Sequence, residues 1–362
     1  MEALAVKYRP KAFKDVVGQD EIKTILGNQL ETGEIKNTYL FCGGAGTGKT
    51  TTARIFANEI NRYQGSPIEL DAASNNSVDD VRELIGQAYT RALDCEFRTY
   101  IIDECHMITQ QGWNAFLKTL EEPPAKSIFI FCTTNPERIP KTILSRVQRY
   151  DFQRLSQQQI INRLKYIVDS ENKEVQENCG DQDSINDIEW AIKQGLPIIE
   201  CDDSAIEYIA KISSGGMRDA ITMLDKCIGY SRNITLENVV KALGVVDYEL
   251  MNTLSTAILC KKSDTVIKII NDIHSSGKDL KVFIKNYTNF VLDLCKYGVT
   301  KSYEFLQIPS ILKLEDYYSD KDLYYFNDLL RQLIKLNDLI KWDTNPKATI
   351  EATLLLECFR ED

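Results

Sequence analysis

A glycine-rich segment at residues 43–50 carries the clearest chemical signal in this sequence. It reads Gly-Gly-Ala-Gly-Thr-Gly-Lys-Thr and fits the phosphate-loop pattern G-x-x-x-x-G-K-[ST] without a mismatch. Glycines let the backbone turn tightly and bring its N–H groups close to an anion. Lys49 can reach the β- and γ-phosphates, and the Thr50 hydroxyl can ligate Mg²⁺. A nucleoside triphosphate is therefore expected to contact Gly43, Gly44, Ala45, Gly46, Thr47, Gly48, Lys49, Thr50 and Thr51.

A second signal lies further along the chain, where the apolar run 100–102 is followed by Asp103 and Glu104. The carboxyl ends of parallel strands point at the nucleotide crevice of such proteins. Asp103 would hold Mg²⁺ through a water molecule, and Glu104 would orient and deprotonate the attacking water. The string Asp-Glu-Cys-His also allows a helicase-type interpretation. We prefer the simpler expectation that His106 packs at the start of the next loop.

Three further residues are weaker candidates. Thr134 follows the apolar run 128–132 and could touch the γ-phosphate or the attacking water, although an ordinary turn gives the same letters. Arg146 could form a surface salt bridge or project into the ATP of a neighbouring subunit. Arg218 opens a helix after two glycines, where a cation opposes the helix dipole. That position indicates either an anionic partner or a local pair with Asp219.

These residues need a scaffold, and the pattern predicts a parallel sheet with helices on both faces. Apolar strands alternate with helices over the first part of the chain, which is typical of such a sheet. We expect strands at 38–42, 67–71, 98–103, 127–133 and 148–152 and helices at 21–36, 50–61, 77–91 and 110–121. After about residue 156 we expect no strand. Helices are predicted there at 156–169, 203–214, 217–231 and 235–243, with a third helical region after a Gly-Val-Val hinge at 244–246.

Composition limits the possible classes of protein. The 362 residues carry a net charge of −10, but residues 169–203 alone hold eleven acids and two lysines. The remainder is close to neutral, which argues against a broadly basic DNA-binding protein and leaves room for local DNA contacts. The ten cysteines form no C-x-x-C pair and there are only two histidines, so a zinc ribbon and a histidine base are unsupported. No apolar run approaches the roughly 20 residues of a membrane span.

The order of the motifs resembles the AAA+ ATPases of the bacterial clamp loader, in particular the gamma/tau family of DNA polymerase III. The resemblance covers about 1–168 and 200–300. It rests on Tyr8-Arg9-Pro10, Val16-Val17-Gly18-Gln19, the phosphate loop, Asp71-Ala72-Ala73-Ser74-Asn75, Asp103-Glu104, Leu120-Glu121-Glu122-Pro123-Pro124, Thr133-Thr134-Asn135, Ser145-Arg146 and Gly216-Met217-Arg218-Asp219-Ala220.

The resemblance implies three domains and an ATPase that uses ATP and Mg²⁺. An α/β AAA+ P-loop domain would span 1–153. An all-α lid would span 154–243, with an acidic insertion at about 170–201, and an all-α collar would span 244–362. The collar would join subunits, identical or different, into a pentameric ring that loads a sliding clamp onto primer–template DNA. The setting would be the cytoplasm of a bacterium or a phage-infected cell, without a membrane partner.

The resemblance also implies roles for particular residues. Thr134 would be the first sensor, Arg146 the finger acting in trans, and Arg218 the lid sensor. Thr50 and Asp103 would serve the metal. The adenine would lie near Tyr8, Arg9, Pro10, Val16 and Val17. Helix starts near 75–77 and 110–111 would face the DNA, where neutral amides and backbone N–H groups can hold phosphates.

Some features depart from the family pattern. The family usually has a four-cysteine zinc module where residues 61–66 contain no cysteine, so we expect no structural zinc. Val147 replaces the usual cysteine after Ser145-Arg146. The sequence ends after the collar, which predicts a short form without the long form's tail, as in a phage or a divergent bacterium. The alternatives are another AAA+ DNA motor, of helicase or branch-migration type, and a non-hydrolysing scaffold subunit of the loader.

Overall fold

A computed structural model describes most of the chain. The described residues are 2–90, 95–178, 197–243, 248–308 and 313–359. The chain divides into two compact units, Met1–Arg232 and Asn233–Asp362. Among the helices of the described residues, none has both the length and the apolar character that a bilayer crossing requires.

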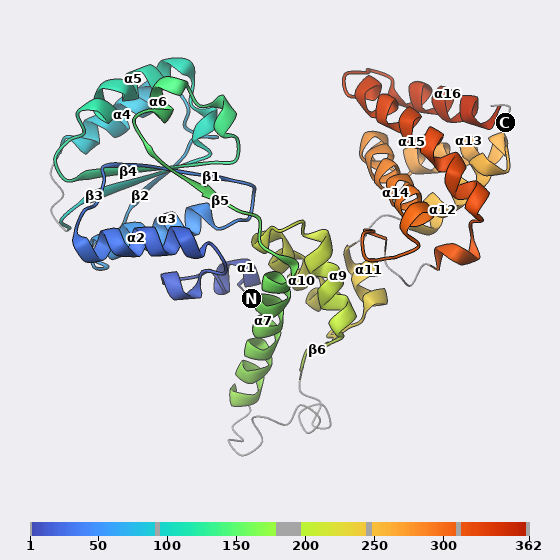
Figure 1. The fold of residues 1–362 in the computed structure, drawn as a ribbon, viewed down its shortest axis with the longest axis horizontal. Helices are drawn as coiled ribbons and strands as arrows, with labels where there is room; N and C mark the ends of the chain where they lie inside the picture. Colours follow the sequence, from blue (N-terminus) through green and yellow to red (C-terminus); the bar gives the residue numbers. More distant parts are fainter. Residues whose placement is uncertain (1, 91–94, 179–196, 244–247, 309–312, 360–362) are drawn as a thin grey trace. The chain divides into compact units, whose positions relative to one another are not determined.

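The first unit is built around a five-stranded sheet (Figure 1). The strand order is β2-β3-β4-β1-β5, and every neighbouring pair is parallel. The strands are β1 (Thr38–Gly43), β2 (Ile68–Asp71), β3 (Arg98–Asp103), β4 (Ser127–Thr133) and β5 (Gln148–Phe152). Their positions match the five predicted strands closely. Because all strands are parallel, their carboxyl ends meet at one edge, where the phosphate loop and the two acids follow β1 and β3.

Helices cover both faces of this sheet, as predicted (Figure 1). The helices are α2 (Asp20–Thr32) and α3 (Lys49–Ile60) on one face, and α4 (Val78–Ala88), α5 (Gln110–Glu121) and α6 (Lys141–Leu144) on the other. Alternate strand residues point to opposite faces. Phe41 thus packs in the cluster that includes Phe56 of α3, whereas Phe131 packs against Trp113 of α5 with ring centroids 5.5 Å apart. This double burial explains why the strands read as continuous apolar runs.

The rest of the first unit is mainly helical. Its elements are α1 (Leu4–Lys7), α7 (Gln157–Asn178), α9 (Asp203–Ile212), α10 (Met217–Tyr230), the short 3-10 turns η1 (Phe13–Asp15), η2 (Cys105–Met107) and η3 (Pro136–Arg138), and the two-residue strand β6 (Glu200–Cys201). The N-terminal α1 contacts α10, where the Leu4 N–H donates to Oδ2 of Asp225 at 3.2 Å. The beginning of the chain is therefore held against the helices that follow the sheet.

The helix predicted at 156–169 was too short, because α7 continues to Asn178. The buried positions of this extension are polar, namely Asn172 and Gln176, so the apolar periodicity stops before the helix does. The Asn172 side chain makes two hydrogen bonds to the backbone of Ile199, at 2.9 and 2.7 Å. The remainder of the acidic segment, at 179–196, lies outside the described residues.

The second unit is helical apart from the two-residue strand β7. Its elements are β7 (Asn233–Ile234), α11 (Leu236–Leu243), α12 (Tyr248–Leu259), α13 (Ser263–Ser275), α14 (Leu280–Thr300), η5 (Leu314–Asp316), α15 (Asp320–Ile340) and α16 (Pro346–Cys358). Tyr287 and Phe326 are completely buried in its core. The expectation of no strand after 156 was wrong for β6 and β7. The helix α11, assigned above to the lid, lies in this unit, and the predicted hinge at 244–246 is outside the described residues.

Candidate active site

The phosphate loop joins β1 to the start of α3, as its sequence predicted. Gly43 has a φ of 151°, and a Cβ atom at this position would lie 2.5 Å from the carbonyl oxygen of Phe152. Only glycine therefore lets the loop leave β1 while it packs on β5. The loop ends at the N-terminus of α3, where free backbone N–H groups favour an anion.

Lys49 is almost completely buried, with 6% of its surface exposed. Its Nζ donates to the carbonyl oxygens of Gly43 at 2.9 Å and Gly44 at 2.8 Å. An ammonium group has three hydrogens, so one remains for a ligand. Burial lowers the pKa of Lys49, while the charges of Glu104 and Asp103 act against this shift. An anionic ligand would favour the charged form further, which is the expected property of a phosphate-binding lysine.

The phosphate loop and the strand-end acid are joined directly. The Thr50 hydroxyl donates to Oδ2 of Asp103 at 2.8 Å. A hydroxyl and a carboxylate are the hard oxygen groups that Mg²⁺ prefers, and Mg²⁺ commonly combines one or two protein groups with phosphates and water. These residues therefore fit the magnesium site that was predicted from the sequence.

Glu104 lies in a small polar cluster beside this pair. Its backbone adopts a left-handed conformation with a φ of 45°, which is rare for a non-glycine residue and concentrates at functional sites. Its Oε2 accepts hydrogen bonds from the Thr134 hydroxyl at 2.8 Å and from the Thr134 N–H at 3.3 Å. The structure thus brings together two of the predicted site residues. His106 also belongs to the cluster, since its Nδ1 lies 3.3 Å from the same oxygen.

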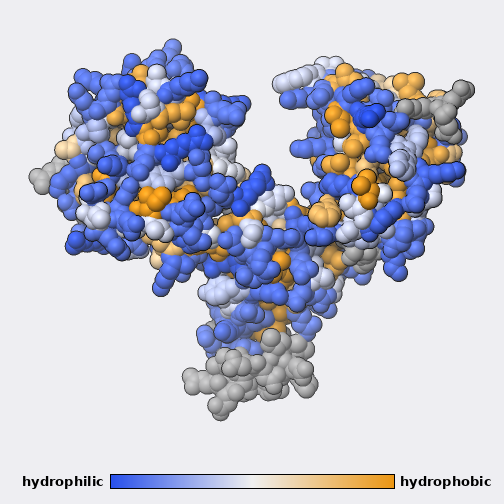
Figure 2. Space-filling model, in the orientation of Figure 1, coloured by the Kyte–Doolittle hydropathy of each residue, from blue (hydrophilic) through white to orange (hydrophobic). Residues whose placement is uncertain are grey.

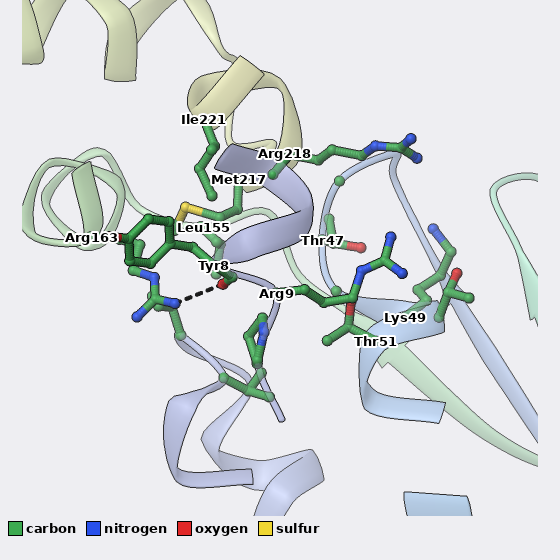
Figure 3. A pocket seen from close by; sticks show the side chains of 17 residues that line it. Tyr8, Arg9, Thr47, Lys49, Thr51, Leu155, Arg163, Met217, Arg218 and Ile221 are labelled. Atoms are coloured by element: carbon green, nitrogen blue, oxygen red, sulfur yellow. Dashed lines mark hydrogen bonds between the residues drawn. The ribbon is translucent and has the colours of Figure 1, made fainter. Parts of the chain in front are cut away.

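A pocket adjoins the phosphate loop (Figure 3). All five residues expected to surround adenine line it: Tyr8, Arg9, Pro10, Val16 and Val17. Five other residues that line the pocket were not predicted from the sequence: Ala5, Leu155, Arg163, Met217 and Ile221. Met217 belongs to the motif Gly216-Met217-Arg218-Asp219-Ala220, whereas Leu155 and Arg163 belong to no motif that indicates nucleotide binding. Arg163 donates to the Tyr8 carbonyl at 2.9 Å, so it fixes the backbone of the N-terminal segment beside the pocket (Figure 3).

The start of α10 is docked on the phosphate loop. The Met217 N–H donates to the Gly46 carbonyl at 3.0 Å, and a Cβ atom on Gly46 would lie 3.1 Å from Cα of Gly216. Arg218 extends from this helix start across the loop (Figure 3). Burial and the charges of Arg54 and Arg218 lower the pKa of Arg9. Several cations therefore surround the pocket, as binding of a polyphosphate requires.

Arg146 is separated from these groups. Its Nε and Nη2 donate to Oε1 of Glu121 at 3.0 and 2.5 Å. The Thr38 hydroxyl donates to the Arg146 carbonyl at 2.9 Å, so Arg146 lies at the amino edge of the sheet. At about 3.3 Å per residue, the six-residue strand β1 places that edge about 16 Å from the phosphate loop. Arg146 thus forms a surface ion pair and does not contact the site of its own chain.

The two helix starts proposed to face DNA lie next to each other. Ser77 caps α4 by accepting from the Asp80 N–H, and Thr109 caps α5 by accepting from the Gly112 N–H. The Thr109 N–H donates to the Asn76 carbonyl at 3.4 Å. The starts of α4 and α5 therefore adjoin, and backbone N–H groups at helix starts are among the groups that contact nucleic-acid phosphates.

The start of the segment 61–66 is anchored by side-chain hydrogen bonds of Asn61. Asn61 donates to the Phe97 carbonyl at 2.7 Å and accepts from the Phe97 N–H at 2.9 Å. In the part of the chain that the structure describes, no three histidine, cysteine, aspartate or glutamate side chains are grouped to hold a metal ion. The expectation that the protein binds no zinc stays a prediction.

Comparisons with known proteins agree with these features. The family model described as "DNA polymerase III, delta subunit" matches residues 68–156, and that described as "DNA polymerase III subunits gamma and tau domain III" matches 234–310. The chain is 32% identical to DNA polymerase III subunit tau of Bacillus subtilis over 99% of its own length, and it covers 63% of that relative. It thus spans less than two thirds of that protein.

A solved structure with a similar fold and a second relative in sequence support the fold and the family of this chain. An alanine-to-serine mutant of RuvB from Thermotoga maritima aligns with a TM-score of 0.50 at 17% identity, covering 86% of this chain and 99% of RuvB. The predicted fold, an α/β AAA+ P-loop region followed by helical regions, is confirmed. DNA polymerase III subunit gamma of Buchnera aphidicola is 30% identical over 84% of this chain, which covers 82% of that relative. The chain therefore belongs to the gamma/tau family of DNA polymerase III.

Proposed function

We propose that this chain is an ATP-driven clamp-loader subunit that opens a sliding clamp and loads it onto primer–template DNA during replication. The observation that carries the proposal is the 2.8 Å hydrogen bond between Thr50 and Asp103, which joins the phosphate loop to the strand-end acid beside a pocket. Membership in the gamma/tau family of DNA polymerase III supports a role for this nucleotide site in replication.

ATP binds with its phosphates in the loop 43–51 and its adenine in the pocket. Lys49 turns one or more of its N–H groups from the loop carbonyls to the β- and γ-phosphates. Thr50 would ligate Mg²⁺ and Asp103 would hold the ion through water, and bound there Mg²⁺ would supply positive charge beside the phosphates. The apolar side chains and the Tyr8 ring provide the surface against which a base packs. The adenine-contacting residues are Tyr8, Arg9, Pro10, Val16 and Val17.

Hydrolysis requires a base beside the γ-phosphate. Glu104 accepts a proton from the attacking water, and Thr134, which already holds the Glu104 carboxylate, senses the γ-phosphate. Arg218 reaches the phosphates from the lid, a role that its position across the loop supports (Figure 3). When the γ-phosphate leaves, the contacts that order these segments are lost, and this change drives the conformational cycle.

Arg146 serves the ATP of a neighbouring subunit. About 16 Å separates the amino edge of the sheet from the chain's own phosphate loop, and one arginine side chain does not span that distance. A guanidinium stabilises the charge that develops on a transferred phosphoryl group. Turnover should therefore depend on assembly of a ring, which we propose to be pentameric.

Assembly and DNA binding use other surfaces. The three-part division, with a P-loop domain at 1–153, a lid at 154–243 and a collar at 244–362, assigns subunit contacts mainly to the collar. In that region Tyr324 and Trp342 are 79% and 85% exposed, and Figure 2 shows apolar side chains within a largely polar surface. The adjoining starts of α4 and α5 contact primer–template DNA. We propose the bacterial cytoplasm, or that of a phage-infected cell, as the setting.

The decisive experiment compares ATP turnover by the assembled complex with its cognate clamp on primed and unprimed template. A clamp loader hydrolyses ATP faster on primed DNA with the clamp present. Strand unwinding or translocation would instead support a different AAA+ DNA motor. Binding of ATP without turnover under all conditions would support a scaffold subunit and would contradict the catalytic roles of Glu104 and Arg146.

A further inference from the structure

The Glu104 carboxylate is held on one side only. Both hydrogen bonds from Thr134 reach Oε2, and Nδ1 of His106 lies 3.3 Å from that same oxygen. Every hydrogen bond or ion pair that the described part of the chain gives this carboxylate involves Oε2. A carboxylate oxygen accepts hydrogen bonds but cannot donate them. Oε1 is therefore the oxygen that can accept a hydrogen from water.

The surroundings of His106 determine which ring nitrogen carries hydrogen. Nδ1 lies 3.2 Å from the Thr133 hydroxyl as well as 3.3 Å from Oε2 of Glu104. A bare Nδ1 would direct a lone pair toward a carboxylate, which is electrostatically unfavourable. The Asn135 N–H donates to the Thr133 oxygen at 3.0 Å, and that oxygen retains a second lone pair that can accept from Nδ1. This arrangement favours an Nδ1–H group shared between the two oxygens.

We propose that His106 is a positioning residue for ATP hydrolysis, whose Nδ1–H holds Oε2 of Glu104 so that Oε1 faces the attacking water. The inference rests on the proposed ATPase function. A threonine hydroxyl has a single hydrogen to donate. When Thr134 gives that hydrogen to the γ-phosphate or the water, His106 and the Thr134 N–H still hold the carboxylate. His106 thus prevents the base from rotating at the moment when it is used.

The competing explanation is that His106 only fills space, since its side chain is 12% exposed. The two explanations differ in what a substitute must provide. Asparagine at this position keeps an N–H group near the site of Nδ1, whereas leucine keeps volume and provides no hydrogen bond. A positioning role predicts that asparagine restores function and leucine does not. A packing role predicts the opposite order.

The first test is a nitrogen NMR spectrum of the purified chain with labelled histidine. The sequence contains only His106 and His274, so a His274→Gln variant assigns both rings. We expect a hydrogen on Nδ1 of His106 and a changed Nδ1 signal in Glu104→Ala. An Nδ1 without hydrogen, or a signal that Glu104→Ala leaves unchanged, would overturn the proposal. This readout requires no ATP turnover.

The second test is steady-state kinetics of the assembled complex. We expect His106→Leu to lower kcat roughly 10- to 100-fold, the cost of a misplaced catalytic group, with KM for ATP and binding of a non-hydrolysable analogue within about twofold. His106→Asn should recover most of the loss. His274→Leu, the same change at the exposed histidine of α13, should match wild type.

Two kinetic results would overturn the proposal. One is a His106→Leu complex with kcat within twofold of wild type. The other is an equal loss in the leucine and asparagine variants together with a lowered melting temperature, which would indicate packing. A wild-type complex that binds ATP but never hydrolyses it would defeat the proposed function instead, and the NMR result would still decide how His106 contacts Glu104.

Discussion

The two edges of the five-stranded sheet hold their charged groups in opposite ways. At the carboxyl edge, Lys49 is 6% exposed and donates to the loop, and Thr50 donates to Asp103 within the same chain. At the amino edge, the side chains of Arg146 and Glu121 are 32% and 52% exposed and form a surface ion pair. The proposed ATP site is thus assembled in advance within the chain, whereas Arg146, which we propose to act on another molecule, is held by a partly exposed ion pair.

The free energies of the contacts at the two edges should differ in the same way. An exposed ion pair contributes about 0–1 kcal/mol and is easily exchanged for another partner. A buried ammonium that loses its partners costs several times more, because burial disfavours the charged form. Substitutions at the carboxyl edge should therefore act in the isolated chain, and substitutions at the amino edge should act only after assembly.

The largest expected effect comes from Lys49→Ala at the carboxyl edge. The variant loses charge-assisted hydrogen bonds to the phosphates, each worth about 1.5–3 kcal/mol, so ATP affinity should fall at least about 100-fold. Titration of the isolated chain with a fluorescent ATP analogue measures the loss. Lys36→Ala removes an exposed lysine just before β1, at the amino edge, and should bind normally. Near-normal binding by Lys49→Ala would contradict the phosphate-loop assignment.

The second largest expected effect is a loss of ATP turnover when Arg146, at the amino edge of the sheet, is replaced. Arg146→Ala should lower turnover by the assembled complex by roughly 10³-fold or more, since an arginine finger contributes that much to kcat. ATP binding by the isolated chain should not change, because Arg146 lies about 16 Å from the chain's own loop. ATP binding by the isolated chain and ATP turnover by the assembled complex should both be measured. Lys49→Ala, at the carboxyl edge, should impair both, whereas Arg146→Ala should impair only turnover.

Arg149→Ala is the matched control for Arg146. Arg149 is also an exposed arginine in an ion pair, with Asp151 at 2.7 Å, and it lies only three residues away. Its loss should leave turnover within about twofold of wild type. An equal defect of Arg146→Ala in an isolated chain would remove the trans role and, with it, the functional contrast between the two edges.

Glu104→Gln should have the third effect. Glutamine keeps an oxygen that can accept from Thr134 but cannot take a proton from water, so kcat should fall roughly 10²- to 10⁴-fold. Affinity for ATP should be retained, and a nucleotide-bound complex should accumulate. Rapid filtration after incubation with labelled ATP would detect this nucleotide-bound complex. Weakened ATP binding of the same size as in Lys49→Ala would show that Glu104 supports binding and not hydrolysis.

How well the sequence predicted these features depended on how local they are. The strands and the phosphate loop were predictable because double burial gives continuous apolar runs and because glycine spacing follows from backbone geometry. The sequence assigned Thr50 and Asp103 to one metal site because two strand ends meet at one edge, and the structure places these two side chains in contact. Each of these inferences needs only the residues of one or two neighbouring elements.

Other features depend on contacts that no local pattern contains. The extension of α7 buries Asn172, whose partner is the backbone of Ile199, so neither hydrophobic periodicity nor spacing indicates it. His106 looked like a packing residue because its contact with Glu104 depends on the left-handed turn at Glu104 itself. The partner of Arg146 also depends on how the segment between α6 and β5 packs beside the end of α5, which the sequence order does not specify.

The smallest expected effect tests whether the ion pair at the amino edge competes with the partner of Arg146. Each guanidinium nitrogen has an acceptor within the chain, and Glu121 takes two of the three. Glu121→Gln removes the opposing charge, so ATP-dependent assembly should tighten by up to about fivefold, the value of an exposed pair. Sedimentation at graded chain concentrations measures this shift. Glu122→Gln removes the same charge at the next exposed position and should change nothing. Weaker assembly in Glu121→Gln alone would instead mean that the pair orients Arg146 for its neighbour, and the loose hold at the amino edge would then be part of the site.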